Sequence, residues 1–104
     1  MTNAQIILSN SIRLMENGTI GSTGRQITFT DVNGQSRTVA EPEVIHTFET
    51  WKVLGRRVKR GEHAKAKIRI WKFTTKNVND NEEPTTNMFM RDAYFFTYGQ
   101  TEAI

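Results

Sequence analysis

Hydrophobic residues at a spacing of three and four positions open the chain. Residues 2–17 show this spacing in an apolar stripe formed by Ala4, Leu8, Ile12 and Met15. Thr2 and Gln5 match a capping box, and Asn17-Gly18 matches a helix stop. We therefore predict an amphipathic helix over residues 2–17 that packs on the domain, the alternative being that it docks a partner.

A spacing of two follows in residues 25–40, where Ile27 and Phe29 alternate with polar side chains. Asn33-Gly34 fits a two-residue type I′ turn, and Glu41-Pro42 is expected to break the returning strand. These residues predict a β-hairpin.

Residues 47–60 return to helical spacing. Thr47 is suited to cap the N-terminus, and Gly61 stands where a helix usually ends. We predict a helix here, with Trp51 at the centre of its buried stripe and Gly55 allowing another backbone to approach. The expected stripe is Phe48, Trp51, Leu54, Gly55 and Val58.

Residues 64–73 alternate again and predict a strand with one core face and one outer face. The expected core face is Ala64, Ala66, Ile68 and Ile70, and the other face is Lys65, Lys67, Arg69, Trp71 and Phe73. Polar residues 74–87 predict a surface loop, and residues 89–98 a last strand. On that strand we expect Tyr94, Phe96 and Tyr98 in the core and Phe95 on the outer surface beside Trp71.

These elements predict one α+β domain over residues 1–104, in which two helices accompany two antiparallel β-hairpins that form a small sheet. The order is helix, hairpin, helix, hairpin. The chain has no cysteine, which excludes disulfides and thiolate metal sites and suits a cytoplasmic protein. It also has no apolar run long enough to span a bilayer, so we expect no membrane partner.

Charge is distributed unevenly along the chain. Nine basic residues and one acid lie between Trp51 and Phe73, whereas the rest of the chain has five basic and ten acidic residues. A concentrated basic segment favours a polyanionic partner more than the net charge of +3 does.

Cations beside exposed rings are what a single-stranded nucleic acid needs, because cations follow phosphates and rings stack on bases. The candidate binding residues are Lys52, Arg56, Arg57, Lys59, Arg60, Lys65, Lys67, Arg69, Trp71, Phe73 and Phe95. Two structural explanations stay open. Trp71 and Phe73 could lie under the loop that follows them, and cations on an exposed strand often only prevent edge-to-edge aggregation.

Catalytic and cofactor motifs are missing from the sequence. Its two histidines, His46 and His63, form no metal-binding pair, and there is no Gly-rich phosphate loop or cysteine nucleophile. We therefore expect no enzyme activity, no cofactor, no metal site and no small-molecule substrate.

Two stretches carry a resemblance to a known family. The run FETWKVLGRRVKRGE (48–62) resembles the F-x-T-W-K-x-L-G-R-x-V-K-K-G-E signature of the ArdC-like N-terminal domain, the single-stranded DNA-binding module of plasmid antirestriction proteins. FFTYGQTE (95–102) is similar to that family's closing V-F-D-V-S-Q-T-E strand, although Thr97 replaces an acid and Arg60 replaces a lysine. The matched span is 43–102.

This resemblance implies an α+β fold, single-stranded DNA binding without sequence specificity, and carriage on plasmids, phages or integrated elements. The zinc metalloprotease domain that often follows in the family is not in these residues, so we expect no protease activity. Two alternatives stay open. The chain could be an inhibitor-type module whose basic face binds an acidic protein partner, or, with less support, a general RNA chaperone.

Overall fold

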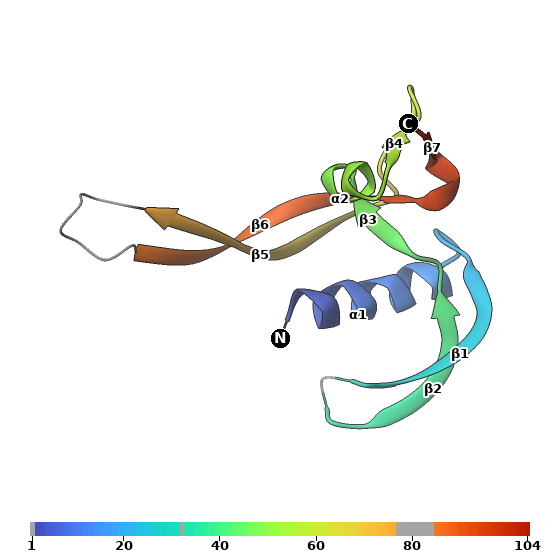
Figure 1. Cartoon of the computed structure of the whole chain (residues 1–104). Coiled ribbons are helices and arrows are strands. Elements are labelled where there is room, and N and C mark those ends of the chain that lie inside the picture. Colours follow the sequence, from blue (N-terminus) through green and yellow to red (C-terminus); the bar gives the residue numbers. More distant parts are fainter. Residues whose placement is uncertain (1, 32, 77–84) are drawn as a thin grey trace.

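The computed structural model describes residues 2–31, 33–76 and 85–104 (Figure 1). In chain order its elements are α1 (Asn3–Glu16), β1 (Ser22–Thr30), β2 (Ser36–Pro42), β3 (Ile45–Thr47), α2 (Phe48–Val53), β4 (Arg56–Val58), β5 (Ala66–Lys76), β6 (Thr85–Thr97), the 3₁₀ helix η1 (Tyr98–Gln100) and β7 (Thr101–Ala103). The predicted α+β class is confirmed, and the order of helices and hairpins roughly matches. Within the described residues the strands form three antiparallel sheets, β1-β2, β3-β6-β5 and β4-β7, so the two predicted hairpins do not share one sheet.

The first helix begins and ends where its local signals predicted. The Thr2 N–H donates to Gln5 Oε1 at 2.8 Å, and the Gln5 N–H donates to Thr2 Oγ1 at 3.2 Å, which completes the capping box. Asn17 caps the C-terminus, and its N–H donates to the Arg13 carbonyl at 3.0 Å. All of these contacts lie within a few residues, which is why sequence alone predicts them.

The first hairpin is confirmed, but its turn differs from the prediction. Thr30 pairs with Ser36, which leaves a five-residue loop instead of two residues. Asp31 Oδ1 accepts from the N–H groups of Asn33 and Gln35 at 2.9 and 3.0 Å and so stabilises the longer loop. The strand ends at the Glu41-Pro42 pair as expected, although β2 includes both residues and so extends two residues beyond the predicted end at Ala40.

The second helix is much shorter than predicted. Thr47 caps it as expected, since its Oγ1 accepts from the Thr50 N–H, but the helix ends at Val53 instead of Arg60. Gly55 follows with a φ of 84°, the left-handed conformation that ends helices. Residues after Gly55 form β4 and pair with β7, so the predicted stripe does not form, and Phe48 and Leu54 are about half exposed.

Replacing Gly55 with alanine should lower the free energy of unfolding by about 1–2 kcal/mol, because a Cβ disfavours the left-handed conformation. Nothing lies within 4 Å of that Cβ, so crowding adds no further cost. Gly99→Ala is the matched control, since Gly99 also has open space but no positive φ. Urea denaturation of both variants measures the difference; equal costs would contradict the backbone explanation.

The core lies between α1 and one face of the β3-β6-β5 sheet. In the register, Ala66 opposes Phe95 and Ile68 opposes Ala93, so these residues share a face with Ile70. The buried cluster on this side is Leu14, Ile20, Ile45, Ile68, Ile70, Ala93 and Phe95. Ile68 and Ile70 are in the core as predicted, but Phe95 is also there, only 2% exposed, so its expected place on the outer surface is wrong.

Strands β5 and β6 together form a long two-stranded arm, which covers this core at its inner end and continues beyond it at its outer end (Figure 1). The molecule is long and flat, with principal dimensions of 54 × 40 × 18 Å. The pairing runs without interruption from Ala66↔Phe95 to Lys76↔Thr85, so the predicted loop of residues 74–87 is too long. Residues 77–84, which include all three acidic residues of this predicted loop, lie outside the described residues. The outer end of the arm therefore projects from the body of the domain (Figure 1).

Candidate nucleic-acid interface

The face of the arm opposite the core is called here the outer face. Because side chains alternate along a strand and directly opposed residues share a face, register assigns its members. They are four opposed pairs, Lys67 with Tyr94, Arg69 with Asp92, Trp71 with Met90, and Phe73 with Met88. Lys67, Arg69, Trp71 and Phe73 were predicted for this face, whereas Tyr94 was predicted for the core.

Most of the outer face is open to solvent. Tyr94 is 57% exposed and Phe73 is 63% exposed, and Lys67 and Arg69 are exposed as well. Tyr94 therefore takes the place beside the cations that sequence analysis gave to Phe95. The hydroxyl group of Tyr94 could have indicated this placement from the sequence. A tyrosine hydroxyl favours a solvent-exposed face, whereas phenylalanine has no polar group that needs a hydrogen-bond partner.

Trp71 is less open than predicted. It is half-buried beside the first turn of α1, where Asn3 Nδ2 donates to the Trp71 carbonyl at 2.9 Å and Asn3 Oδ1 accepts from the Trp71 N–H at 2.8 Å. A cavity of about 490 Å³ lies at this place, lined by Thr2, Asn3, Ala4, Trp71, Phe73 and Met88. The first turn of α1 thus fixes the backbone of β5 at Trp71, halfway along the four pairs of the outer face.

One acidic side chain, Asp92, accompanies the cations of the outer face. Arg69 Nε lies 3.6 Å from Asp92 Oδ1, and both side chains remain largely exposed. An exposed ion pair of this kind contributes little to stability, at most about 1 kcal/mol. Within residues 2–31, 33–76 and 85–104, Lys67 has no ion-pair partner. Its charge is therefore available to a ligand.

Arg56 and Arg57, two of the predicted binding residues, are engaged within the fold. Arg56 Nε donates to Thr101 Oγ1 at 2.8 Å, and its guanidinium lies 4.0 Å from the centre of the Tyr98 ring. Arg57 Nε donates to Glu102 Oε1 at 2.9 Å. These contacts hold β4 against β7, so both arginines have structural roles that sequence analysis did not assign.

Four further predicted cations, Lys52, Lys59, Arg60 and Lys65, are exposed. Lys59 is partly engaged, because its Nζ donates to the Gly99 carbonyl at 3.3 Å. Arg60 and Lys65 belong to the loop of residues 59–65, which leads from β4 to β5 and so to the base of the arm. This loop is a second place where charge is presented to solvent.

Gln100 holds that loop in place. Its side chain is buried, and its Nε2 donates to the His63 carbonyl at 2.6 Å and to Glu62 Oε2 at 3.1 Å. Its Oε1 accepts from the Thr97 N–H at 2.9 Å. The two stretches that carry the family resemblance, 48–62 and 95–102, therefore contact each other through this side chain and through the β4-β7 pairing.

Trp51 anchors the body of the domain. It is 4% exposed, and its Nε1–H donates to the Phe96 carbonyl at 2.9 Å. The His46 ring meets it edge-on, with ring centres 4.8 Å apart. Burial lowers the pKa of His46, which keeps its imidazole neutral at neutral pH. Trp51 is thus a core residue and not a stacking partner for a ligand.

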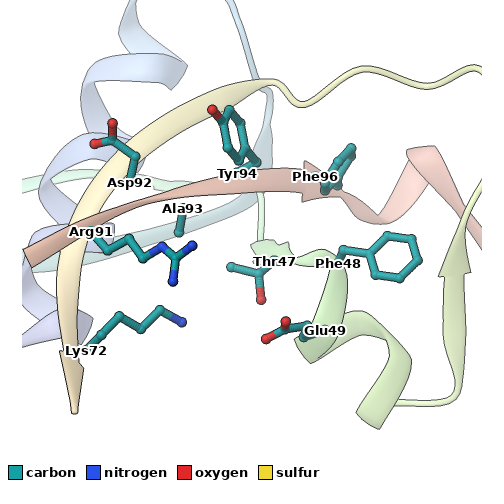
Figure 2. A pocket seen from close by; sticks show the side chains of 9 residues that line it. All are labelled: Thr47, Phe48, Glu49, Lys72, Arg91, Asp92, Ala93, Tyr94 and Phe96. Carbon is teal, nitrogen blue, oxygen red and sulfur yellow. The ribbon is translucent and has the colours of Figure 1, made fainter. Parts of the chain in front are cut away.

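A small open pocket lies at the edge of β6 where β3 gives way to α2 (Figure 2). Its volume is about 290 Å³. Lys72 and Arg91 extend from the core side of the arm toward Thr47 and Glu49. Arg91 is a cation that sequence analysis did not select, because it lies in a stretch dominated by aromatic residues. Together they add two positive charges at the edge of the arm.

Among the described residues, no group of three histidine, aspartate or glutamate side chains could hold a metal ion. The helices that the structure describes are too short or too polar to cross a membrane. Comparison of the chain with protein-family models, curated proteins and solved structures gave no match.

Proposed function

We propose that this chain is a single-stranded DNA-binding domain without sequence specificity, the activity that its resemblance to the ArdC-like N-terminal domain implies. The outer face of the arm is its main contact. The observation that supports this is the juxtaposition of exposed Tyr94 and Phe73 with exposed Lys67 and Arg69 on one face of the arm. Rings of this kind stack on bases while neighbouring cations neutralise phosphates.

The surface favours single strands over duplexes. In a duplex the bases stack on each other and present only their edges, so flat rings on a protein have no base face to contact. The rings of the outer face suit bases whose faces are free. Every base has such a face, and stacking therefore supplies affinity without reading sequence.

A protein partner is the second candidate. Met88 and Met90 also belong to the outer face and are exposed, and protein interfaces are enriched in methionine, aromatic residues and arginine. An inhibitor-type module would use the same surface on an acidic partner. The two functions differ in their response to a bare nucleic acid, which an inhibitor of this kind does not need to bind.

Titration with a labelled oligodeoxythymidylate at several salt concentrations tests the proposal. Binding should weaken with salt, with log K falling against log salt by about 0.7 for each phosphate neutralised. Lys67→Gln should lower that slope by about one phosphate's share, whereas Arg13→Gln, which removes a charge from α1, should leave it unchanged. Equal affinity for a duplex of the same length, or no binding at low salt, would contradict the proposal and favour the protein partner.

A further inference from the structure

The four opposed pairs of the outer face follow one another like rungs. They are Lys67–Tyr94, Arg69–Asp92, Trp71–Met90 and Phe73–Met88, and the register is unbroken through all four. Successive rungs are two residues apart along each strand. With a rise of about 3.3–3.4 Å per residue, neighbouring rungs lie about 7 Å apart.

Each rung presents one planar group. Tyr94, Trp71 and Phe73 supply aromatic rings to three of them, and Arg69 supplies a guanidinium to the other. A guanidinium plane stacks on rings much as an aromatic side chain does. Asp92 Oδ1 lies 3.6 Å from Arg69 Nε on the same face, and the Asn3 side chain hydrogen-bonds the backbone of Trp71 at the free edge of β5. The backbone of the Trp71 rung is therefore fixed by the first turn of α1.

The rung spacing is about twice the rise of about 3.4 Å per nucleotide in B-form DNA. A single strand with stacked bases would place two bases in the distance between neighbouring rungs. An extended strand with separated bases would place one base at each rung. Separated bases also expose the faces on which the planar groups of the arm can stack.

The arm offers a ligand only one of its two faces near the body. Ile68, Ile70 and Phe95 on the opposite face are buried in the core beside α1. A paired two-stranded ribbon twists strongly, and β5 and β6 cross in this way in Figure 1. A single strand is flexible enough to follow that winding surface, whereas a duplex is stiff on this length scale.

We propose that the outer face binds an extended single strand at one nucleotide per rung, so that the arm holds about four nucleotides. This inference rests on the proposed function and adds to it a site size and a strand conformation. Lys67 at the inner end neutralises phosphate, and charge complementarity therefore fits a polyanion along this surface. The basic loop of residues 59–65 receives the strand where it leaves the inner end of the arm.

Binding of oligodeoxythymidylates of two, four, six, eight and twelve nucleotides to the whole chain tests the inference. Affinity should rise steeply up to about four nucleotides and then only slowly, since further nucleotides meet charge but no ring. Tyr94→Ala and Phe73→Ala should each weaken binding of the four-nucleotide strand by about 5- to 150-fold, the usual range for loss of one stacked base. Both side chains are mostly exposed, so thermal melts of these variants should stay close to that of the parent protein.

Two matched variants sharpen the result. Tyr94→Phe keeps the ring and should bind like the parent protein. Phe29→Ala removes a partly exposed ring from β1, which belongs to a different sheet from the arm, and should also bind normally. Strong binding of the twelve-nucleotide strand that Lys67→Gln weakens but neither ring variant alters would overturn the rung model and leave the proposed function standing. Absence of binding at every length would reject the proposed function itself.

Discussion

Trp51→Ala should lower the free energy of unfolding by about 3–5 kcal/mol, the usual cost of removing a large buried aromatic side chain. The ring is almost fully buried, and its Nε1–H bonds to the Phe96 carbonyl, so truncation opens a cavity and leaves that carbonyl without its donor. For a small domain this is a large part of the total stability. Urea denaturation followed by circular dichroism measures the change.

Leu54→Ala is the matched control, because the helix predicted from sequence would bury both residues in one stripe. In the structure Leu54 follows the last residue of α2 and is about half exposed, so its replacement should cost well under the loss at Trp51. A cooperative melt of Trp51→Ala near that of the parent protein, or similar losses at both positions, would contradict the short helix.

Phe95→Ala should be equally destabilising, by about 3–5 kcal/mol, whereas Tyr94→Ala should change stability little. The two residues are neighbours, but alternation along β6 sends Phe95 into the core and Tyr94 to the outer face. Comparing the thermal denaturation of the two variants therefore tests which face of β6 lies in the core. The reverse order of losses would mean that β6 is shifted by one residue, since such a shift exchanges the faces of a strand.

Local signals predicted the parts of the fold that depend on neighbouring residues. The capping box at Thr2 and the cap at Thr47 both form, because a cap involves only the next few positions. The end of α2 could not be predicted in this way. Gly55 and Gly61 both have a positive φ, and β7, the strand that pairs with β4 after Gly55, comes more than forty residues later in the chain.

The sequence predicted an exposed face with cations and aromatic rings, but it did not predict all of the residues that form this face. Lys67, Arg69 and Phe73 lie on an exposed face as expected, because the alternation of side chains along β5 alone determines which residues share a face. Which face of β6 joins them depends on the register between strands. Both faces of β6 carry aromatic residues, and the prediction assigned the more aromatic face, which includes Tyr94, to the core and so expected Phe95 on the outer surface. Arg56 and Arg57 were counted as free charges because Thr101 and Glu102, which hold them, are distant in sequence.

The contact of Gln100 with residues 62 and 63 has a consequence for the order in which the molecule takes shape during synthesis. A ribosome makes β4 and the basic loop about forty residues before it makes Gln100 and β7. Until then β4 has no strand to pair with and the loop has no side chain to hold it. The charge of this segment is thus present from the moment it is made, whereas its conformation is set only when residues 100–103 arrive.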